Sequence, residues 1–268
     1  MVKVEIVKID VSAKKAQKMA DHVAEEKPLH IFLNRTHYAT IFCSPSNLKE
    51  LAVGHLISEG IVKSIEEIKE IGLKNEGVCN VKLKPNINLE KRLKLLKPFS
   101  RVILSACGSS SSYQYSGKLP KIRSNLKVKA EVILNCVNRL NSIAENFRRT
   151  GGVHAAAIYK SDGNLIAFAE DVGRHNAVDK AIGTVALNKT DFDECFLTLS
   201  GRLTGDIVLK AARVGLPIVA SLAAAVDSGI AIAQDVDLTL IGFVRGRRMN
   251  IYNVPGRVNL NGQIHKSS

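Results

Sequence analysis

The sequence has no Cys-x-x-Cys pair, no Gly-x-Ser-x-Gly segment and no long apolar run. The five cysteines are odd in number and widely spaced, so neither a zinc knuckle nor a disulfide framework is indicated, and reduced thiols fit best. A membrane span needs roughly 18 apolar residues, and the charged start of the chain lacks the apolar core of a signal peptide. The missing serine-centred turn argues against a Ser-His-Asp hydrolase. We therefore expect a cytoplasmic protein that does not associate with membranes.

What the sequence does contain is enough apolar material for a full core. The 268 residues are 46% hydrophobic and 24% charged, and on a prior of about 100 to 200 residues per domain this length predicts two modest domains. The net charge of +13 favours attraction to anions, although simple solubility explains it equally well. The placement of the arginines has to decide between the two.

The N-terminal part has the patterns of an α+β domain. Residues 38–43 read as a strand, and residues 46–56 read as an amphipathic helix that docks on a sheet and stops at Gly60. Residues 79–83 alternate like a half-buried strand. The basic stretch 91–97 lacks interleaved aromatics, so it is interpreted as a solvated helix face and not as a nucleic-acid surface.

The apolar pattern collapses after Cys107 into a run of Gly, Ser, Tyr and Gln. Such a run cannot bury a core, which predicts a mobile loop over about 105–118 and a domain boundary near its end. We expect an N-terminal α+β domain over 1–125, which ends in this cysteine loop, and a C-terminal domain over 126–268.

The C-terminal domain begins with a helix from about Lys129, followed by a hairpin through 161–164. Helices then alternate with strands as far as Val244. This alternation predicts a layered α/β domain with a mostly parallel sheet.

Cys107 follows the strand-like residues 101–105 and is the only cysteine that precedes a run of glycine and hydroxyl residues. We expect it to be reachable by solvent, where a lowered pKa would make its thiolate a nucleophile or a sulfur carrier. An ordinary exposed loop cysteine remains the alternative. The other cysteines lie in apolar patterns and are predicted to pack in the core: Cys43, Cys79, Cys136 and Cys195.

Three segments suited to anions stand at boundaries between strands and helices, where α/β sheets bind ligands. They are Asp171–Asn176, Ser200–Asp206, with Thr204 as a candidate helix cap, and Phe243–Arg248, which ends the last expected strand with three arginines in four residues. The candidate binding residues are Gly173, Arg174, His175, Ser200, Gly201, Arg202, Phe243, Val244, Arg245, Gly246, Arg247 and Arg248. If these segments meet at one sheet edge, they would hold more than one phosphate.

A purely structural interpretation of the same residues stays open. Asp171 would then be a helix cap, Arg174 and Asp179 would form surface pairs, and the arginines near 245 would solvate a strand end. His154 and His175 suggest a metal, but neither belongs to a His-x-Glu motif and no Cys-x-x-Cys follows, so no metal site is predicted.

Several of these segments together resemble the FdhD family, the sulfur carrier proteins that serve formate dehydrogenase maturation. Residues 47–60 are similar to the family's N-terminal helix, and residues 105–108 to its cysteine loop. Residues 150–155 and 170–180 are similar to its signature. The likeness covers nearly the whole chain, with the motifs in the same order.

The resemblance implies a cytidine-deaminase-like α/β domain without the zinc site, and a homodimer. It implies a sulfurtransferase role, in which a cysteine desulfurase donates sulfur as a persulfide on Cys107. The acceptor would be the molybdenum or tungsten bis(molybdopterin guanine dinucleotide) cofactor of formate dehydrogenase. Residues 243–248 would match the family's cofactor-binding segment.

One departure concerns the second thiol, because Ser110 stands where many members of the family have the second cysteine of a Cys-x-x-Cys pair. One cysteine is enough to carry a persulfide, but a second thiol could help to release the sulfur. Direct attack by the acceptor and reduced activity are both open. An alternative function is a cofactor-binding chaperone without sulfur transfer, and a nucleotide hydrolase or deaminase is a weaker one.

Overall fold

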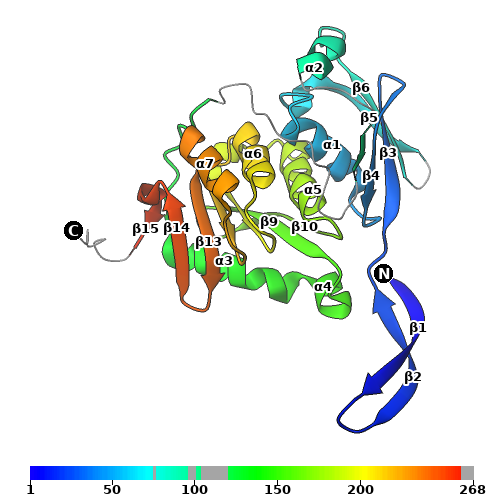
Figure 1. Ribbon diagram of the computed structural model, residues 1–268. Helices are drawn as coiled ribbons and strands as arrows, with labels where there is room; N and C mark the ends of the chain where they lie inside the picture. Colours follow the sequence, from blue (N-terminus) through cyan, green and yellow to red (C-terminus); the bar gives the residue numbers. More distant parts are fainter. Residues whose placement is uncertain (75–76, 96–100, 104–119, 261–268) are drawn as a thin grey trace.

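The computed structural model describes residues 1–74, 77–95, 101–103 and 120–260. In Figure 1 a hairpin projects from an N-terminal sheet unit, and a larger layered unit lies beside that sheet. None of the helices in these ranges is long and apolar enough to cross a membrane.

The N-terminal part consists of the projecting hairpin and a five-stranded sheet. The hairpin pairs β1 (Val2–Asp10) with β2 (Lys15–Val23). The sheet has the order β5-β6-β3-β4-β7. Its strands are β3 (Lys27–Leu33), β4 (Thr36–Cys43), β5 (Ile68–Lys74), β6 (Val78–Leu83) and β7 (Arg101–Ile103). Its helices are α1 (Leu48–Ser58) and α2 (Leu89–Leu95).

The short-range patterns of this part are confirmed. The strands predicted at 38–43 and 79–83 lie within β4 and β6, and each alternates between buried and less buried residues. The basic stretch begins in α2, where Lys91 is exposed as expected of a solvated helix face, whereas Arg92 is part-buried and pairs with Glu67. The side chains of the rest of the stretch, 93–97, lie outside the described residues.

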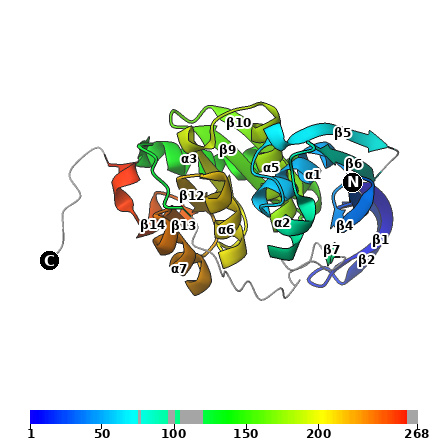
Figure 2. The ribbon, with the colours of Figure 1, turned by 90° about the horizontal axis from the view of Figure 1, so that it is seen from above.

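The prediction that α1 is amphipathic is wrong. Every residue from Leu51 to Ser58 is buried, because the five-stranded sheet covers one side of α1 and α5 (Arg174–Leu187) covers the other (Figures 1 and 2). The two helices touch at glycines: a Cβ added to Gly54 would lie 1.7 Å from the carbonyl oxygen of Asp179. A helix buried on all sides has no polar face for a sequence pattern to reveal.

The C-terminal part is built on a six-stranded sheet with the order β10-β9-β11-β12-β13-β14. Its strands are β9 (His154–Lys160), β10 (Leu165–Asp171), β11 (Cys195–Leu199), β12 (Ile218–Ser221), β13 (Thr239–Arg245) and β14 (Arg248–Asn253). Besides α5, its helices are α3 (Ala130–Ile143), α4 (Glu145–Thr150), α6 (Gly205–Val214) and α7 (Asp227–Val236). A small separate pair joins β8 (Val128–Lys129) to β15 (Val258–Asn259).

The sheet lies between two helical layers. Along β9, Ala155, Ala157 and Tyr159 pack in the core formed with α3, whereas Ala156 and Ile158 pack in the core formed with α5, α6 and α7. Both faces of the sheet are therefore buried, which explains why its strands read as continuous apolar runs.

The order of helices and strands from α3 to β13 is confirmed except for α4, which was not predicted. The sheet is mixed and not mostly parallel, because β9 and β14 each run antiparallel to their neighbours. β13 is not the last strand, since Gly246, with a φ of +59°, permits a tight turn into β14. Ile122 already packs in the core of the layered unit, just before the predicted boundary at 125.

Candidate functional site

The ends of five strands meet at one edge of the six-stranded sheet. β11, β12 and β13 are parallel to one another, and β9 is antiparallel to both β10 and β11. The carboxyl ends of β10, β11, β12 and β13 therefore lie beside the amino end of β9. The three anion-suited segments stand at the carboxyl ends of β10, β11 and β13, so the topology brings all three to this edge. Open α/β sheets bind their ligands at such an edge.

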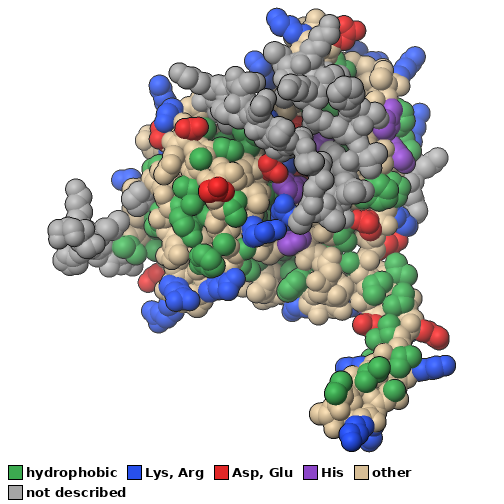
Figure 3. All heavy atoms as spheres, in the orientation of Figure 1, with side chains coloured by type: hydrophobic (Ala, Val, Ile, Leu, Met, Phe, Trp, Pro, Cys, Tyr) green, Lys and Arg blue, Asp and Glu red, His purple; other side chains and the backbone are tan. Residues whose placement is uncertain are grey.

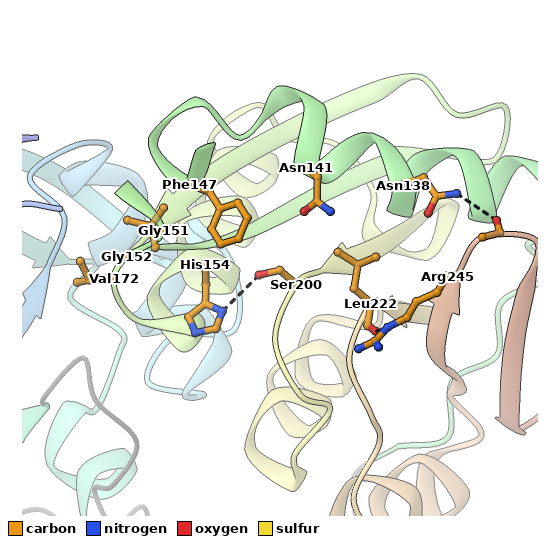
Figure 4. Close-up of a pocket in the computed structure, with 12 residues that line it drawn as sticks. Asn138, Asn141, Phe147, Gly151, Gly152, His154, Val172, Ser200, Leu222 and Arg245 are labelled. Atoms are coloured by element: carbon orange, nitrogen blue, oxygen red, sulfur yellow. Dashed lines mark hydrogen bonds between the residues drawn. The ribbon is translucent and has the colours of Figure 1, made fainter. Parts of the chain in front are cut away.

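An open pocket of about 700 Å³ lies here (Figure 4). Its walls come from α3, from α4 and the loop that follows it, and from the ends of β9 to β13. Pockets of this size accommodate nucleotide-sized ligands.

Three of the predicted binding residues line the pocket: Ser200, Arg245 and Gly246. Two more pack directly behind it, because a Cβ added to Gly201 would lie 3.2 Å from Cβ of Arg174 and 3.7 Å from Nδ1 of the lining residue His154. The segments after β10 and β11 are thus in contact at the base of the pocket.

The segment Phe243–Arg248 divides among three environments. Val244 is fully buried in the core against α3, so its side chain does not face the pocket. A bulge at Phe243, with a φ of 51°, turns its ring outward, and the guanidinium of Arg245 lies 5.8 Å from the ring centroid. Arg247 and Arg248 are exposed at the turn outside the pocket lining, where Figure 3 shows a gathering of basic side chains.

The other predicted residues lie apart from the lining. Gly173 is buried next to the lining residue Val172, and Arg202 is exposed. His175 is half-buried, and burial together with the Lys210 ammonium lowers its pKa to about 4. His175 is therefore neutral at physiological pH and supplies no positive charge to an anion.

Most of the pocket lining was not among the candidate binding residues. The lining residues outside that set are Asn138, Asn141, Phe147, Gly151, Gly152, Val153, His154, Val172 and Leu222, although Val172 lies within the predicted segment Asp171–Asn176. The Gly-Gly-Val-His run at 151–154 was visible as part of the family signature. Asn138 and Asn141 carry no such signal, because they stand one turn apart on the polar face of α3 and resemble any solvated pair.

His154 and Ser200 form a hydrogen-bonded pair inside the pocket (Figure 4). The backbone N–H of Ala155 donates to Oγ of Ser200 at 3.0 Å, and Oγ lies 3.3 Å from Nδ1 of His154. Burial lowers the pKa of His154, and the nearby Arg174 lowers it further. The imidazole is therefore neutral at physiological pH.

The signature run 170–180 proves to be largely structural. Glu170 accepts hydrogen bonds from the backbone N–H of Phe147 and so holds the start of α4. Asp171 is not the cap of α5, which is Gly173. It accepts from the backbone N–H of Gly173 in the turn before the helix and forms a 2.7 Å ion pair with Lys180 in which both side chains are fully buried. These residues fix the base of the pocket without facing it.

The interpretation of Asp179 as part of a surface pair is wrong, because its side chain is only 1% exposed. It accepts hydrogen bonds from Lys210 on α6 and Ser58 on α1, and it contacts His55. Burial acts to raise the pKa of Asp179 and of Glu59, but the Lys210 ammonium and His55 together outweigh it. The pKa of Asp179 is therefore well below its usual range, and that of Glu59 is about 2. His55 is itself buried, and its Nδ1 lies 3.2 Å from the Asp179 carboxylate.

Four of the cysteines are confirmed as core residues: Cys43, Cys79, Cys136 and Cys195. Burial raises the pKa of all four thiols, to about 12 for Cys43 and to about 11 for Cys79 and Cys136. Cys107 and Ser110 lie outside the described residues, as does most of the predicted loop.

Two further predictions can be compared with the described residues. Thr204 stands at the cap position of α6, but its hydroxyl makes no capping bond, and the backbone N–H of Gly205 donates to Ser228 instead. Within the described ranges, no three His, Cys, Asp or Glu side chains gather as ligands for a metal ion.

Comparison with known proteins identifies the relatives of this chain. A sequence model of the FdhD/NarQ family matches residues 24–259. A sulfur carrier protein FdhD from Sulfolobus acidocaldarius is 38% identical and covers 90% of this chain and 92% of its own length. One of the same name from Shouchella clausii is 36% identical, with 90% and 91% covered.

A solved structure agrees with these sequences. The crystal structure described as a formate dehydrogenase accessory protein from Desulfotalea psychrophila is similar with a TM-score of 0.77 and 28% identity. The similarity covers 96% of this chain and 99% of that one. The fold, the family match and the close relatives agree, and the chain belongs to the FdhD/NarQ family.

Proposed function

We propose that this protein is a sulfur carrier for formate dehydrogenase. It takes sulfur from a cysteine desulfurase as a persulfide on Cys107 and passes it to the molybdenum or tungsten bis(molybdopterin guanine dinucleotide) cofactor before that cofactor enters the dehydrogenase. The names of its relatives support the carrier role and the link to formate dehydrogenase. The family resemblance supports the choice of donor and acceptor.

The main support for the proposal is the burial and the thiol pKa of the described cysteines. A persulfide carrier needs a thiolate that a partner protein can reach. Four of the five thiols are buried with raised pKa values, so they meet neither condition. Cys107, which the sequence places in a glycine- and serine-rich run, is left as the candidate.

The transfer consists of two displacements at sulfur. The Cys107 thiolate attacks the outer sulfur of the desulfurase persulfide, the S–S bond breaks, and the desulfurase cysteine leaves as its thiolate. The acceptor then uses an electron pair to bond that outer sulfur, and Cys107 leaves as a thiolate. The acceptor loses two electrons formally, so this route requires neither a second thiol at position 110 nor an added oxidant.

The pocket suits the nucleotide half of the proposed acceptor. Arg245 offers a cation for a phosphate, and its Nε donates to the carbonyl oxygen of Leu222 at 2.9 Å, which fixes the plane of the guanidinium. The uncharged amides of Asn138 and Asn141 on α3 also line the pocket, and Asn138 lies beside the arginine turn, where its Nδ2 donates to the carbonyl oxygen of Gly246 at 3.4 Å. A cation close to uncharged amides fits a ligand that joins a phosphate to a polar heterocycle.

Intact-mass spectrometry tests the carrier role. After incubation with a cysteine desulfurase and cysteine, we expect the wild type to gain one sulfur atom that a reductant removes. We expect Cys107→Ala to gain none and the core variant Cys136→Ala to gain it as the wild type does. A wild type that gains no sulfur from an active desulfurase would overturn the proposal.

A second experiment separates sulfur transfer from cofactor sheltering. When the protein is produced together with a formate dehydrogenase that depends on it, we expect Cys107→Ala to leave that enzyme inactive. If the variant restores full formate oxidation, the protein acts as a cofactor-binding chaperone instead.

A further inference from the structure

His154 has no role in the transfer chemistry, although it lies in the pocket at the amino end of β9. Figure 4 shows one ring nitrogen directed at Ser200 and the other on the opposite side of the ring. Within the described part of the chain, that second nitrogen, Nε2, has no hydrogen-bond partner. The question is which ring nitrogen carries the proton.

The hydrogen bonds of Ser200 favour one arrangement. Its Oγ accepts the backbone N–H of Ala155 at 3.0 Å and still has its own proton to donate. Among the described residues, Nδ1 of His154, at 3.3 Å, is placed to accept that proton. A neutral imidazole that accepts at Nδ1 carries its proton on Nε2.

The surroundings favour the neutral ring. The charged groups that act on His154 are Arg174 on α5, which disfavours a second positive charge, and Asp171 on β10, which favours one. Asp171 is engaged by the buried Lys180 ammonium at 2.7 Å, so its influence on the imidazole is largely offset. Burial and Arg174 therefore determine the direction of the shift, and the pKa of His154 is lowered.

We infer that His154 binds the ligand of this pocket as a neutral hydrogen-bond donor, with its Nε2–H directed at an acceptor atom of the guanine nucleotide and its Nδ1 held by the Ser200 hydroxyl. This inference rests on the proposed function, because that function supplies the ligand. The pocket then recognises its ligand with two different donors. Arg245 supplies a charged one suited to phosphate, and His154 supplies an uncharged one.

Two substitutions test the two ring nitrogens separately, because each keeps the hydrogen bond of one nitrogen and loses that of the other. The carbonyl oxygen of His154→Asn takes the place of Nδ1 and keeps the bond from Ser200, but this variant has no donor at the Nε2 position. The longer amide of His154→Gln places an N–H near the Nε2 position and gives up the contact with Ser200. A purely structural His154 would tolerate Asn and suffer from Gln, which is the reverse of what the inference requires.

Binding of guanosine diphosphate to the full chain, measured by calorimetry, is the test. We expect His154→Asn to raise the Kd about tenfold, the effect of losing one hydrogen bond, and His154→Gln to stay within about threefold of the wild type. Nitrogen NMR of the wild-type imidazole should show the proton on Nε2, and Ser200→Ala should allow both tautomers. Thermal unfolding of each variant checks that the fold is retained.

The outcomes separate this inference from the proposed function. If the wild type binds guanosine diphosphate and His154→Asn binds it equally well, or if NMR places the proton on Nδ1, the role of His154 is overturned and the pocket keeps its function. If the wild type does not bind the nucleotide, the pocket assignment and the role of His154 fall together, while the persulfide on Cys107 is still tested by mass spectrometry.

Discussion

Two regions of the molecule combine charged with short polar side chains but differ in how far the charges are buried. One is the interior contact of α1, α5 and α6 around Asp179 and Lys210, and the other is the pocket at the sheet edge. In the interior contact, Asp179 and Lys210 are almost fully buried and pair with each other. In the pocket, Arg245 is exposed and directed at a space that a ligand can fill. Both regions lie beside the signature segment 170–180 and both combine charge with short polar side chains.

The difference shows that a charged residue at a strand-to-helix boundary does not by itself mark a binding site. After β10 the chain enters α5, which lies between α1 and the sheet, so its polar side chains must find partners inside the protein. After β13 the chain turns at Gly246 on the surface, so Arg245 keeps access to solvent. The first region should therefore control stability and the second should control binding.

The largest expected effect is on the interior contact. Lys210→Met removes the cation and leaves Asp179 and Glu59 buried without it, which should destabilise the protein by about 3 to 5 kcal/mol. Urea unfolding measures this loss. The matched control is Lys121→Met, which breaks only an exposed pair with Asp237 and should cost under about 1 kcal/mol. Equal losses in the two variants would contradict the paired interior.

A smaller loss is expected where α1 and α5 touch. A Cβ on Gly54 would lie 1.7 Å from a backbone oxygen, so Gly54→Ala forces the helices apart and should destabilise the protein by about 2 to 3 kcal/mol. Gly72 in β5 has no atom within 4 Å of the corresponding position. Gly72→Ala is therefore the control, and thermal unfolding of both variants is the measurement. A Gly54→Ala protein as stable as this control would show that the helices do not pack this closely.

The elements of the fold that the sequence predicted correctly are those with a regular local pattern. Strands β4 and β6 and helix α3 each have one buried face, so their apolar residues recur with the period of the element. α1 was predicted at nearly the right place but with an exposed side, because the helix that covers that side is more than a hundred residues away in the sequence. The direction of β9 was also unpredictable, since a hairpin does not specify which strand joins the sheet centre.

The site was predicted in part for a similar reason. Ser200 follows β11 and Arg245 ends β13, and the carboxyl ends of parallel strands meet at one edge of an α/β sheet. Asn138 and Asn141 belong to a helix on the other face, and only tertiary packing brings them to the same pocket. Val244 was included by its position in a motif, and the alternation of β13 turns its side chain into the core.

The smallest expected effect in free energy belongs to the pocket, and it distinguishes the two regions most sharply. Arg245→Ala should weaken the binding of guanosine diphosphate about tenfold, because a charged donor to phosphate is lost, and should leave the unfolding midpoint nearly unchanged, because the side chain is exposed. Lys121→Ala removes the same charge at the opposite edge of the sheet, where Asp237 precedes β13. If calorimetry shows that both variants weaken binding equally, the net charge of the protein attracts the nucleotide and the pocket does not select it. A tenfold loss confined to Arg245→Ala would instead assign phosphate recognition to the pocket, since two variants of equal charge would then differ only in position.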